Sequence, residues 1–284
     1  MLKRMAAIET GSGLHWVGDG FPVNSVFSYH KLGKELSPFL LLDYAAPTHF
    51  EPAATPRGVG QHPHRGFETV TIVYAGEVSH KDNAGNAGTI GPGDVQWMTA
   101  GKGIIHEEFH SQTFTEKGGD FEMVQLWVNL PAKDKQAPPN YQDILNRDIP
   151  AVQLPGGAGT LRVISGRYGG AEGPANTFTP VDLWDAVMAE NNHFRLPLRD
   201  GYTAAILAFR GDLTINGSQP LKPGQLALLD REGDGVELQT KEAAKFLVLH
   251  AQPIDEPIAG YGPFVMNTRA EIHQAISDFN AGLF

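Results

Sequence analysis

The sequence predicts a mostly β protein that consists of two tandem antiparallel β-barrels and ends in a helix. Three observations lead to this fold class: strand-like stretches bounded by turn residues run through the whole chain, one pattern of strands and turns occurs twice, and helical periodicity is rare. The 33 glycines and 20 prolines are spread along the 284 residues, which is typical of many short strands joined by turns. This length also suits two domains of about 130 to 150 residues each.

The strand-like stretches alternate apolar and polar residues or are rich in β-branched ones. Each is bounded by Gly, Pro, Asn or Asp, which favour turns. They comprise residues 69–74, 94–98, 121–128, 161–164, 203–209, 225–229 and 245–250. Strands are therefore expected in both halves of the chain.

An internal repeat indicates how these strands are grouped. TIVYAGEVSH (71–80) followed by IGPGDVQWM (90–98) is echoed by ILAFRGDLTI (206–215) followed by LKPGQLALL (221–229). Two copies of one small β-barrel explain the repeat, and a chance match of two segments punctuated by Gly and Pro is the alternative. The Pro-rich stretch LPAKDKQAPPNYQ (130–142) has the composition of a connector, so we expect domains at residues 1–135 and 136–284. A small closed barrel leaves an interior that can hold a ligand.

The C-terminal stretch NTRAEIHQAISDFN predicts the helix that ends the second domain. Asn267 or Thr268 can cap it, and Thr268 with Glu271 has the spacing of a capping box. One apolar face follows at i, i+3, i+4 and i+7, formed by Ile272, Ala275, Ile276 and Phe279. We expect this face to lie against a sheet.

Composition excludes several classes of function. The formal net charge of −10 and the absence of a basic tract argue against a nucleic-acid partner. The chain has no cysteine, so thiolate sites and disulfides are excluded and any metal must be held by nitrogen and oxygen. No stretch has the length of a signal peptide's apolar region or of a membrane span, and we expect a soluble cytoplasmic protein.

Four metal-competent side chains occur as two closely spaced pairs. His62 and His64 stand in QHPHRGFETVTIVYAG, and His106 and Glu108 stand in GKGIIHEEFH. Residues i and i+2 of a strand point to one face, so two such pairs can converge on one point inside a barrel. Three imidazole nitrogens and one carboxylate oxygen suit iron, manganese, nickel, copper, cobalt or zinc. Open coordination positions would make such a site catalytic rather than structural.

Other residues could replace or supplement this set. Near the two pairs in sequence lie further metal-competent groups, namely Glu68, His80, Glu107 and His110. Glu107 should point away from the pocket if His106 points into it, because neighbours in a strand face opposite sides. In the second copy of the repeat, the positions that correspond to the four residues fall near Pro197, Arg199, Glu237 and Gln239. We therefore expect no metal site in the second barrel and a structural role for its histidines, His193 and His250.

The same residues stand in motifs that closely resemble the pirin family of the cupin superfamily. The matching stretches are DGFPVNSVF, LSPFLLLDYAAP, HPHRGFETVTIVYAGEV, GPGDVQWMTAGKGIIHEE and GPFVMNTRAEI, from about residue 19 to residue 277. The resemblance implies a bicupin fold of two β-barrels or jelly rolls, with metal only in the N-terminal barrel and with His62, His64, His106 and Glu108 as its ligands. Against the broader cupin pattern, Thr99 replaces a proline and four residues separate Gly101 from His106. Glu68 is then expected outside the ligand set.

The family resemblance also implies an activity. Bacterial members are similar to quercetin 2,3-dioxygenases, which open the central ring of a flavonol with dioxygen and release carbon monoxide. We expect one divalent ion per chain, with Fe²⁺ as the first choice, and Glu108 as the general base that takes the proton of the 3-hydroxyl. A flat aromatic substrate needs apolar walls, for which the candidates are Phe67, Trp97, Met98 and Met123.

Two other functions stay open from the sequence. The resemblance to eukaryotic pirin suggests a metal-dependent regulatory protein that binds an enzyme or a transcription factor. Isomerisation of a small polar substrate would need a cation beside the metal, and Arg65 and Lys102 flank the motifs. The strand parity of Arg65 is opposite to that of the histidines, so we expect it to face away from them. We expect a monomer.

Overall fold

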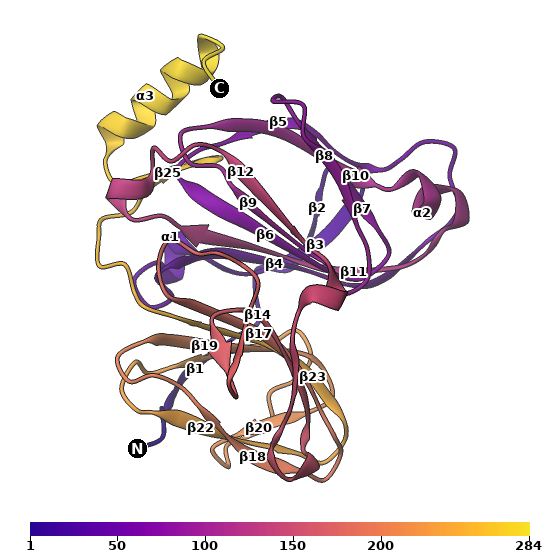
Figure 1. Ribbon diagram of the computed structural model, residues 1–284, viewed down its shortest axis with the longest axis vertical. Helices are drawn as coiled ribbons and strands as arrows, with labels where there is room; N and C mark the ends of the chain where they lie inside the picture. Colours follow the sequence, from indigo (N-terminus) through magenta and orange to yellow (C-terminus); the bar gives the residue numbers. More distant parts are fainter. The chain divides into compact units, whose positions relative to one another are not determined.

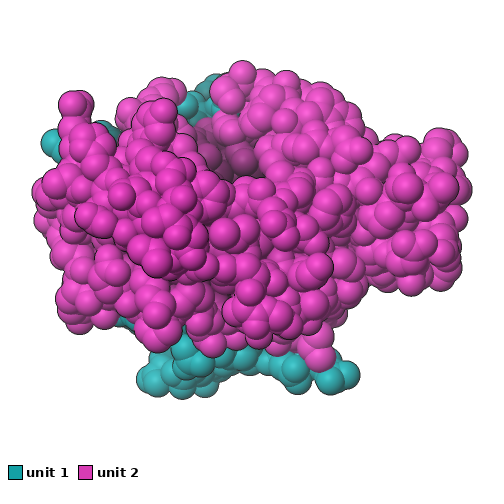
Figure 2. Space-filling model, turned by 90° about the horizontal axis from the view of Figure 1, so that it is seen from above, with its two compact units in different colours: residues 1–11, 34–38, 147–253 teal, residues 12–33, 39–146, 254–284 magenta.

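The structure, a computed structural model, describes residues 1–284 and confirms the predicted fold class. The chain forms two compact units (Figures 1 and 2). Unit 1 comprises residues 1–11, 34–38 and 147–253, and unit 2 comprises residues 12–33, 39–146 and 254–284. Both units are discontinuous in sequence, and the segment that contains the C-terminal helix belongs to unit 2. The boundary expected from sequence between residues 135 and 136 stays a prediction.

Unit 2 contains one large and one small antiparallel sheet in a jelly-roll-like arrangement (Figure 1). The large sheet has the order β12 (Asn140–Ile144), β9 (Val95–Thr99), β6 (Phe67–Ala75), β11 (Gly119–Asn129), β4 (Phe39–Phe50), β3 (Phe21–Ser28) and β2 (Leu14–Val17). The small sheet has the order β5 (Gly58–His64), β10 (Ile104–His110), β7 (Val78–Asp82) and β8 (Ala87–Ile90). Two short helices, α1 (Tyr29–Leu32) and α2 (Gln112–Lys117), connect strands.

Unit 1 repeats this plan. Its large sheet has the order β1 (Met5–Glu9), β21 (Leu226–Leu229), β19 (Thr203–Arg210), β23 (Ala244–Ala251), β17 (Val181–Met188), β14 (Gly159–Ser165) and β13 (Ala151–Gln153). Its smaller sheets are β18 (His193–Pro197), β22 (Gly235–Thr240) and β20 (Leu213–Ile215), and the hairpin of β15 (Arg167–Tyr168) and β16 (Ala171–Glu172). The repeat seen in the sequence thus corresponds to one strand arrangement used twice.

Each unit has its own apolar core. In unit 2 the core contains a cluster of aromatic side chains, Phe21, Phe50, Phe114 and Phe121. In unit 1 the inward residues of β17, β19 and β23 dominate. Burial of each large apolar side chain contributes about 1.5–3 kcal/mol to stability, so each unit is stabilised by an apolar core of its own.

Helix α3 (Arg269–Asn280) follows the hairpin of β24 (Ala259–Tyr261) and β25 (Phe264–Met266) in unit 2 (Figure 1). The predicted capping box is present: Glu271 N donates to Thr268 Oγ1 at 3.3 Å, and Thr268 N donates to Glu271 Oε2 at 2.7 Å. The predicted apolar face packs on the two strand residues Phe264 and Met266. None of the three helices combines the length and apolar character that crossing a membrane requires.

Candidate metal centre

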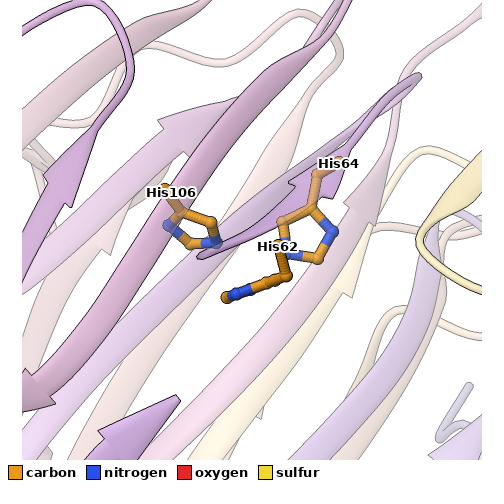
Figure 3. Close-up of side chains that lie close together, drawn as sticks. All are labelled: His62, His64 and His106. Carbon is orange, nitrogen blue, oxygen red and sulfur yellow. The ribbon is translucent and has the colours of Figure 1, made fainter. Parts of the chain in front are cut away.

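Three histidines of unit 2 converge on one point. Figure 3 shows the rings of His62, His64 and His106 turned toward one another, and one ligand nitrogen of each lies within 4.8 Å of the others. The ring centres are 4.8 Å apart for His62 and His64, 4.4 Å for His62 and His106, and 5.0 Å for His64 and His106. The two sequence pairs therefore contribute three side chains to a single cluster.

The register of β5 and β10 explains this convergence. His106 lies opposite His62, and Ile104 lies opposite His64. Along β10 burial alternates strictly, so Ile104, His106, Glu108 and His110 point inward, as the spacing predicts. Glu107 is on the outward face, where its carboxylate lies 3.8 Å from Lys81 Nζ. Alternation on two paired strands is thus sufficient to bring the three imidazoles together.

His62 is oriented for binding through one particular nitrogen. Its Nδ1 lies 2.9 Å from the Gly60 carbonyl oxygen, and because a carbonyl only accepts, Nδ1 carries the proton. In the neutral ring this leaves the lone pair on Nε2. Metal-binding histidines in proteins commonly have their second nitrogen held by such a carbonyl.

His64 and His106 are buried with ring nitrogens that lack partners: Nδ1 of His64 and both nitrogens of His106. Burial and, to a smaller extent, the neighbouring His62 lower the pKa of His106 to about 3. Burial and the two other histidines also lower the pKa of His64 well below its ordinary value, whereas a hydrogen bond to the Pro263 carbonyl raises it. The rings are therefore neutral near pH 7. Buried imidazoles with free lone pairs are costly unless a ligand satisfies them, so this donor set fits a divalent first-row ion.

Glu108 points to the same interior but lies outside the 4.8 Å group. Its side chain is buried, and Gln125 Nε2 donates to both of its oxygens, at 3.3 and 3.2 Å. Across the other edge of β10 it faces His80 of β7. Gln125 thus fixes the position of the carboxylate, and the assignment of Glu108 as fourth ligand stays a prediction.

Two aromatic rings stand beside the cluster. Phe67 and Trp127 lie 5.2 Å and 5.4 Å from the ring of His64, and 4.3 Å from each other at an interplanar angle of 30°. Phe67 is one of the predicted wall residues, whereas sequence reasoning missed Trp127. Trp127 and Gln125 share strand parity with Met123 in FEMVQLWV, which is the signal that could have identified them.

Among the other predicted wall residues, the assignment of Trp97 is wrong. Met98 lies opposite Thr69, on the face of the sheet that carries Phe67, while Trp97 lies opposite Val70 on the other face. Met98 packs with Ile104, which is the cross-strand neighbour of His64, and Met123 belongs to the aromatic core of unit 2. Successive residues of β9 face opposite sides, so only one of Trp97 and Met98 can face the histidines.

The alternative ligands lie elsewhere. A turn at residues 65–66 separates β5 from β6, so Phe67 rather than Glu68 faces His64. Glu68 accepts a hydrogen bond from Thr99 Oγ1 at 2.8 Å, and burial raises its pKa to about 7. His80 stacks on Tyr141 at 5.0 Å, and His110 Nε2 donates to the Gly20 carbonyl at 2.9 Å. None of these residues, nor Glu107, belongs to the cluster.

In unit 1 the two histidines are separate from each other. His193 is exposed on β18. His250 is buried, and its Nδ1 lies 2.8 Å from Asp182 Oδ2, while Arg199 N donates to its Nε2 at 3.1 Å. Both ring nitrogens of His250 are thus used in hydrogen bonds within the fold.

Comparisons with known proteins identify the family of this chain. Residues 20–128 match the Pirin family model, and residues 183–284 match the model of the Pirin C-terminal cupin domain. A Pseudomonas aeruginosa protein named "Putative quercetin 2,3-dioxygenase" is 56% identical over 283 residues, which cover 100% of this chain and 99% of that protein. Human Pirin is 38% identical over 252 residues, which cover 87% of this chain and 82% of that protein.

A solved structure extends the similarity to three dimensions. The crystal structure of a quercetin 2,3-dioxygenase from Acinetobacter baumannii superposes with a TM-score of 0.97 at 53% identity, covering 100% of this chain and 99% of that chain. The match spans both cupin domains and the strands that carry the histidines. The chain therefore belongs to the pirin family of two-domain cupin proteins.

Proposed function

We propose that this protein is a metal-dependent dioxygenase that opens flavonols such as quercetin with dioxygen and releases carbon monoxide. The observation that carries the proposal is the cluster of three imidazoles, in which buried ring nitrogens of His64 and His106 lack partners. The names of the relatives from Pseudomonas aeruginosa and Acinetobacter baumannii support the choice of substrate. We further propose that the N-terminal domain, residues 1–135, carries this site and that the domain of residues 136–284 has none.

In this proposal His62, His64, His106 and Glu108 hold one divalent ion per chain, with Fe²⁺ as the first choice. An ion bound there supplies Lewis acidity and a template for substrate and dioxygen. The rings of His64 and His106 are neutral near pH 7, because burial lowers the pKa of both, so metal binding displaces no proton from either. Nickel, copper, manganese, cobalt and zinc are also compatible with nitrogen and oxygen ligands.

The chain's own side chains then bind and orient the flavonol. Glu108 takes the proton of the 3-hydroxyl as general base, and Gln125, which donates to both of its oxygens, keeps the carboxylate in place. The paired rings of Phe67 and Trp127 provide a flat apolar wall beside His64. A planar aromatic substrate can stack on such a wall.

The test is a metal analysis followed by an oxygen assay. Protein purified anaerobically without added metal is analysed for its metal content, and oxygen uptake and carbon monoxide release are then measured with quercetin. About one redox-active ion per chain with uptake that depends on quercetin supports the proposal. His62→Ala should abolish uptake, whereas the control His193→Ala, an exposed histidine of unit 1, should retain it. Full occupancy without uptake across a set of flavonols would refute the dioxygenase and favour a metal-dependent interaction protein.

A further inference from the structure

The two strands that carry the histidines meet the C-terminal segment, which we define as residues 254–284 of unit 2. β5 ends at His64 and β10 begins at Ile104, and these two residues lie opposite each other. The turn after His64 and the loop before Ile104 are therefore at the same end of the small sheet. The C-terminal segment packs against both this turn and this loop.

The side chain of Arg65, directly after His64, joins that loop to helix α3. It is only 6% exposed, its Nε donates to the Lys102 carbonyl at 2.6 Å, and its Nη1 donates to Asp278 Oδ2 at 2.6 Å. Its guanidinium also lies 4.3 Å from the centre of the Phe284 ring. A planar guanidinium can make these contacts at once, because its donors form a rigid fork whose face can stack on an aromatic ring. Arg65 thus faces away from the cluster, as expected, and links three separate segments.

The backbone of the same turn is attached to β25. Arg65 N donates to the Pro263 carbonyl at 3.3 Å, and Val265 N donates to the Arg65 carbonyl at 3.0 Å. Gly66 has a φ of +90°, and a Cβ at this position would lie 2.0 Å from the Val265 oxygen, so only glycine allows this approach. The Pro263 carbonyl also accepts a hydrogen bond from His64. The C-terminal segment therefore contacts a residue of the cluster directly.

Lys135 holds the turn and β25 together. Its Nζ donates to the Gly66 carbonyl at 2.7 Å and to the Val265 carbonyl at 3.0 Å. The third donor goes to Asn129 Oδ1 at 2.8 Å, on the last residue of β11. One buried side chain thus connects the histidine turn, the C-terminal segment and the large sheet.

The loop before β10 is held by Phe284. A Cβ at Gly103 would lie 2.9 Å from the Phe284 ring, so the ring rests on the backbone of the loop. Asn83 Nδ2 donates to the Phe284 backbone oxygen at 2.8 Å, and Ile105 N donates to Asn83 Oδ1 at 3.2 Å. The segment that leads to His106 is thereby connected to the same C-terminal residues as the turn after His64.

We propose that Arg65 is a positioning residue for the histidine cluster, and that through it the C-terminal segment determines how tightly the three histidines hold a divalent ion. Ligands must be held within about 0.5 Å of the productive geometry, and outer residues that orient them typically change metal affinity about 10- to 100-fold. The inference rests on the metal site of the proposed function and is independent of the flavonol reaction.

The test measures metal affinity rather than activity. Apo-protein is titrated with Zn²⁺ against a chromophoric chelator. Arg65→Met should bind Zn²⁺ about 10- to 100-fold more weakly than wild type. Asp278→Asn, which changes a side chain that is 19% exposed, should weaken binding in the same direction. The matched control is Arg162→Met. It removes the ion pair between Arg162 and Asp185 of unit 1, which is about as buried as the pair between Arg65 and Asp278, and it should leave the Zn²⁺ affinity unchanged.

Two further readouts separate positioning from a merely structural role. Coupling between sites is reciprocal, so Zn²⁺ binding should slow amide hydrogen exchange in α3 of the wild type. The slowing should be smaller in Arg65→Met. Exchange in α2 should not change in either protein. Arg65→Lys keeps the positive charge but lacks the forked donors of the guanidinium, so its Zn²⁺ affinity should lie between those of Arg65→Met and the wild type. If Arg65→Met and Asp278→Asn fold and bind Zn²⁺ as tightly as the wild type, this inference is overturned and the proposed metal site is unaffected. A wild-type chain that binds no metal would overturn both this inference and the proposed metal site.

Discussion

Replacing Lys135 with methionine removes a buried amino group and with it a dependence of stability on pH. In the folded chain, burial lowers the pKa of Lys135 from 10.5 to about 7. In the unfolded chain the pKa returns to about 10.4, so between these two values the unfolded state binds more protons than the folded state. The free energy of unfolding of the wild type therefore rises with pH across this window. Lys135→Met lacks that contribution.

The size of the effect follows from the width of the window. One pH unit corresponds to about 1.4 kcal/mol for one proton, so between about pH 7.5 and about pH 9.5 the wild type should gain about 3 kcal/mol relative to Lys135→Met. The side chain is only 1% exposed, so screening by solvent is small. The assay is urea unfolding of both proteins in the presence of a chelator at several pH values. Lys133→Met, at a side chain that is 79% exposed, is the control and should follow the wild type.

Three hydrogen bonds oppose the effect of burial. Nζ donates to the carbonyls of Gly66 and Val265 and to Asn129 Oδ1, and three acceptors are the number that an ammonium group can use. If these oxygens kept the lysine charged in the folded state, the stability difference between wild type and Lys135→Met would be constant across the range. That result would refute the reasoning from burial.

Three further predictions concern the cluster and its wall. His62→Ala should lose bound metal while the chain stays folded, because the core is apolar and His62 is partly exposed; metal content and circular dichroism test this against His193→Ala, and full metal retention would rule out His62 as a ligand. Glu108→Gln should lower turnover of quercetin about 10²-fold or more with a smaller effect on the free energy of unfolding, and an unchanged rate would assign the base to another group. Trp127→Leu should raise KM for the flavonol more than it lowers metal affinity, whereas Trp16→Leu, at a residue that is 54% exposed, should change neither.

The histidine cluster could be predicted because it depends on local alternation. His62 and His64, like His106 and Glu108, are separated by one residue, and strand geometry alone turns each pair to one face. The capping box of α3 is equally local, since Thr268 and Glu271 are three residues apart. Features determined within one strand or one helical turn are thus accessible from sequence.

Local alternation is insufficient where chain geometry changes between residues that are close in sequence. Glu68 would point to the same face as His64 only if one continuous strand contained both residues. The turn at residues 65–66 interrupts the strand, so Phe67 and not Glu68 faces His64. For Trp97, the sequence predicts an aromatic residue in a strand, but it does not show which face of the sheet is turned toward the histidines. That choice depends on the register between β6 and β9, in which Met98 rather than Trp97 lies opposite Thr69.

The residues that support the cluster were inaccessible for a different physical reason. Arg65 and Asp278 are 213 residues apart, and Lys135 and Val265 are 130 residues apart, so no local periodicity connects them. The sequence identifies which side chains offer nitrogen, whereas the precision of their placement depends on contacts made by the far end of the chain. Since metal affinity is sensitive to small displacements of a ligand, substitutions in α3 can change the site without touching a histidine. A variant's effect on metal binding must therefore be judged from its contacts with the turn after His64 and not from its distance in sequence from the histidine motifs.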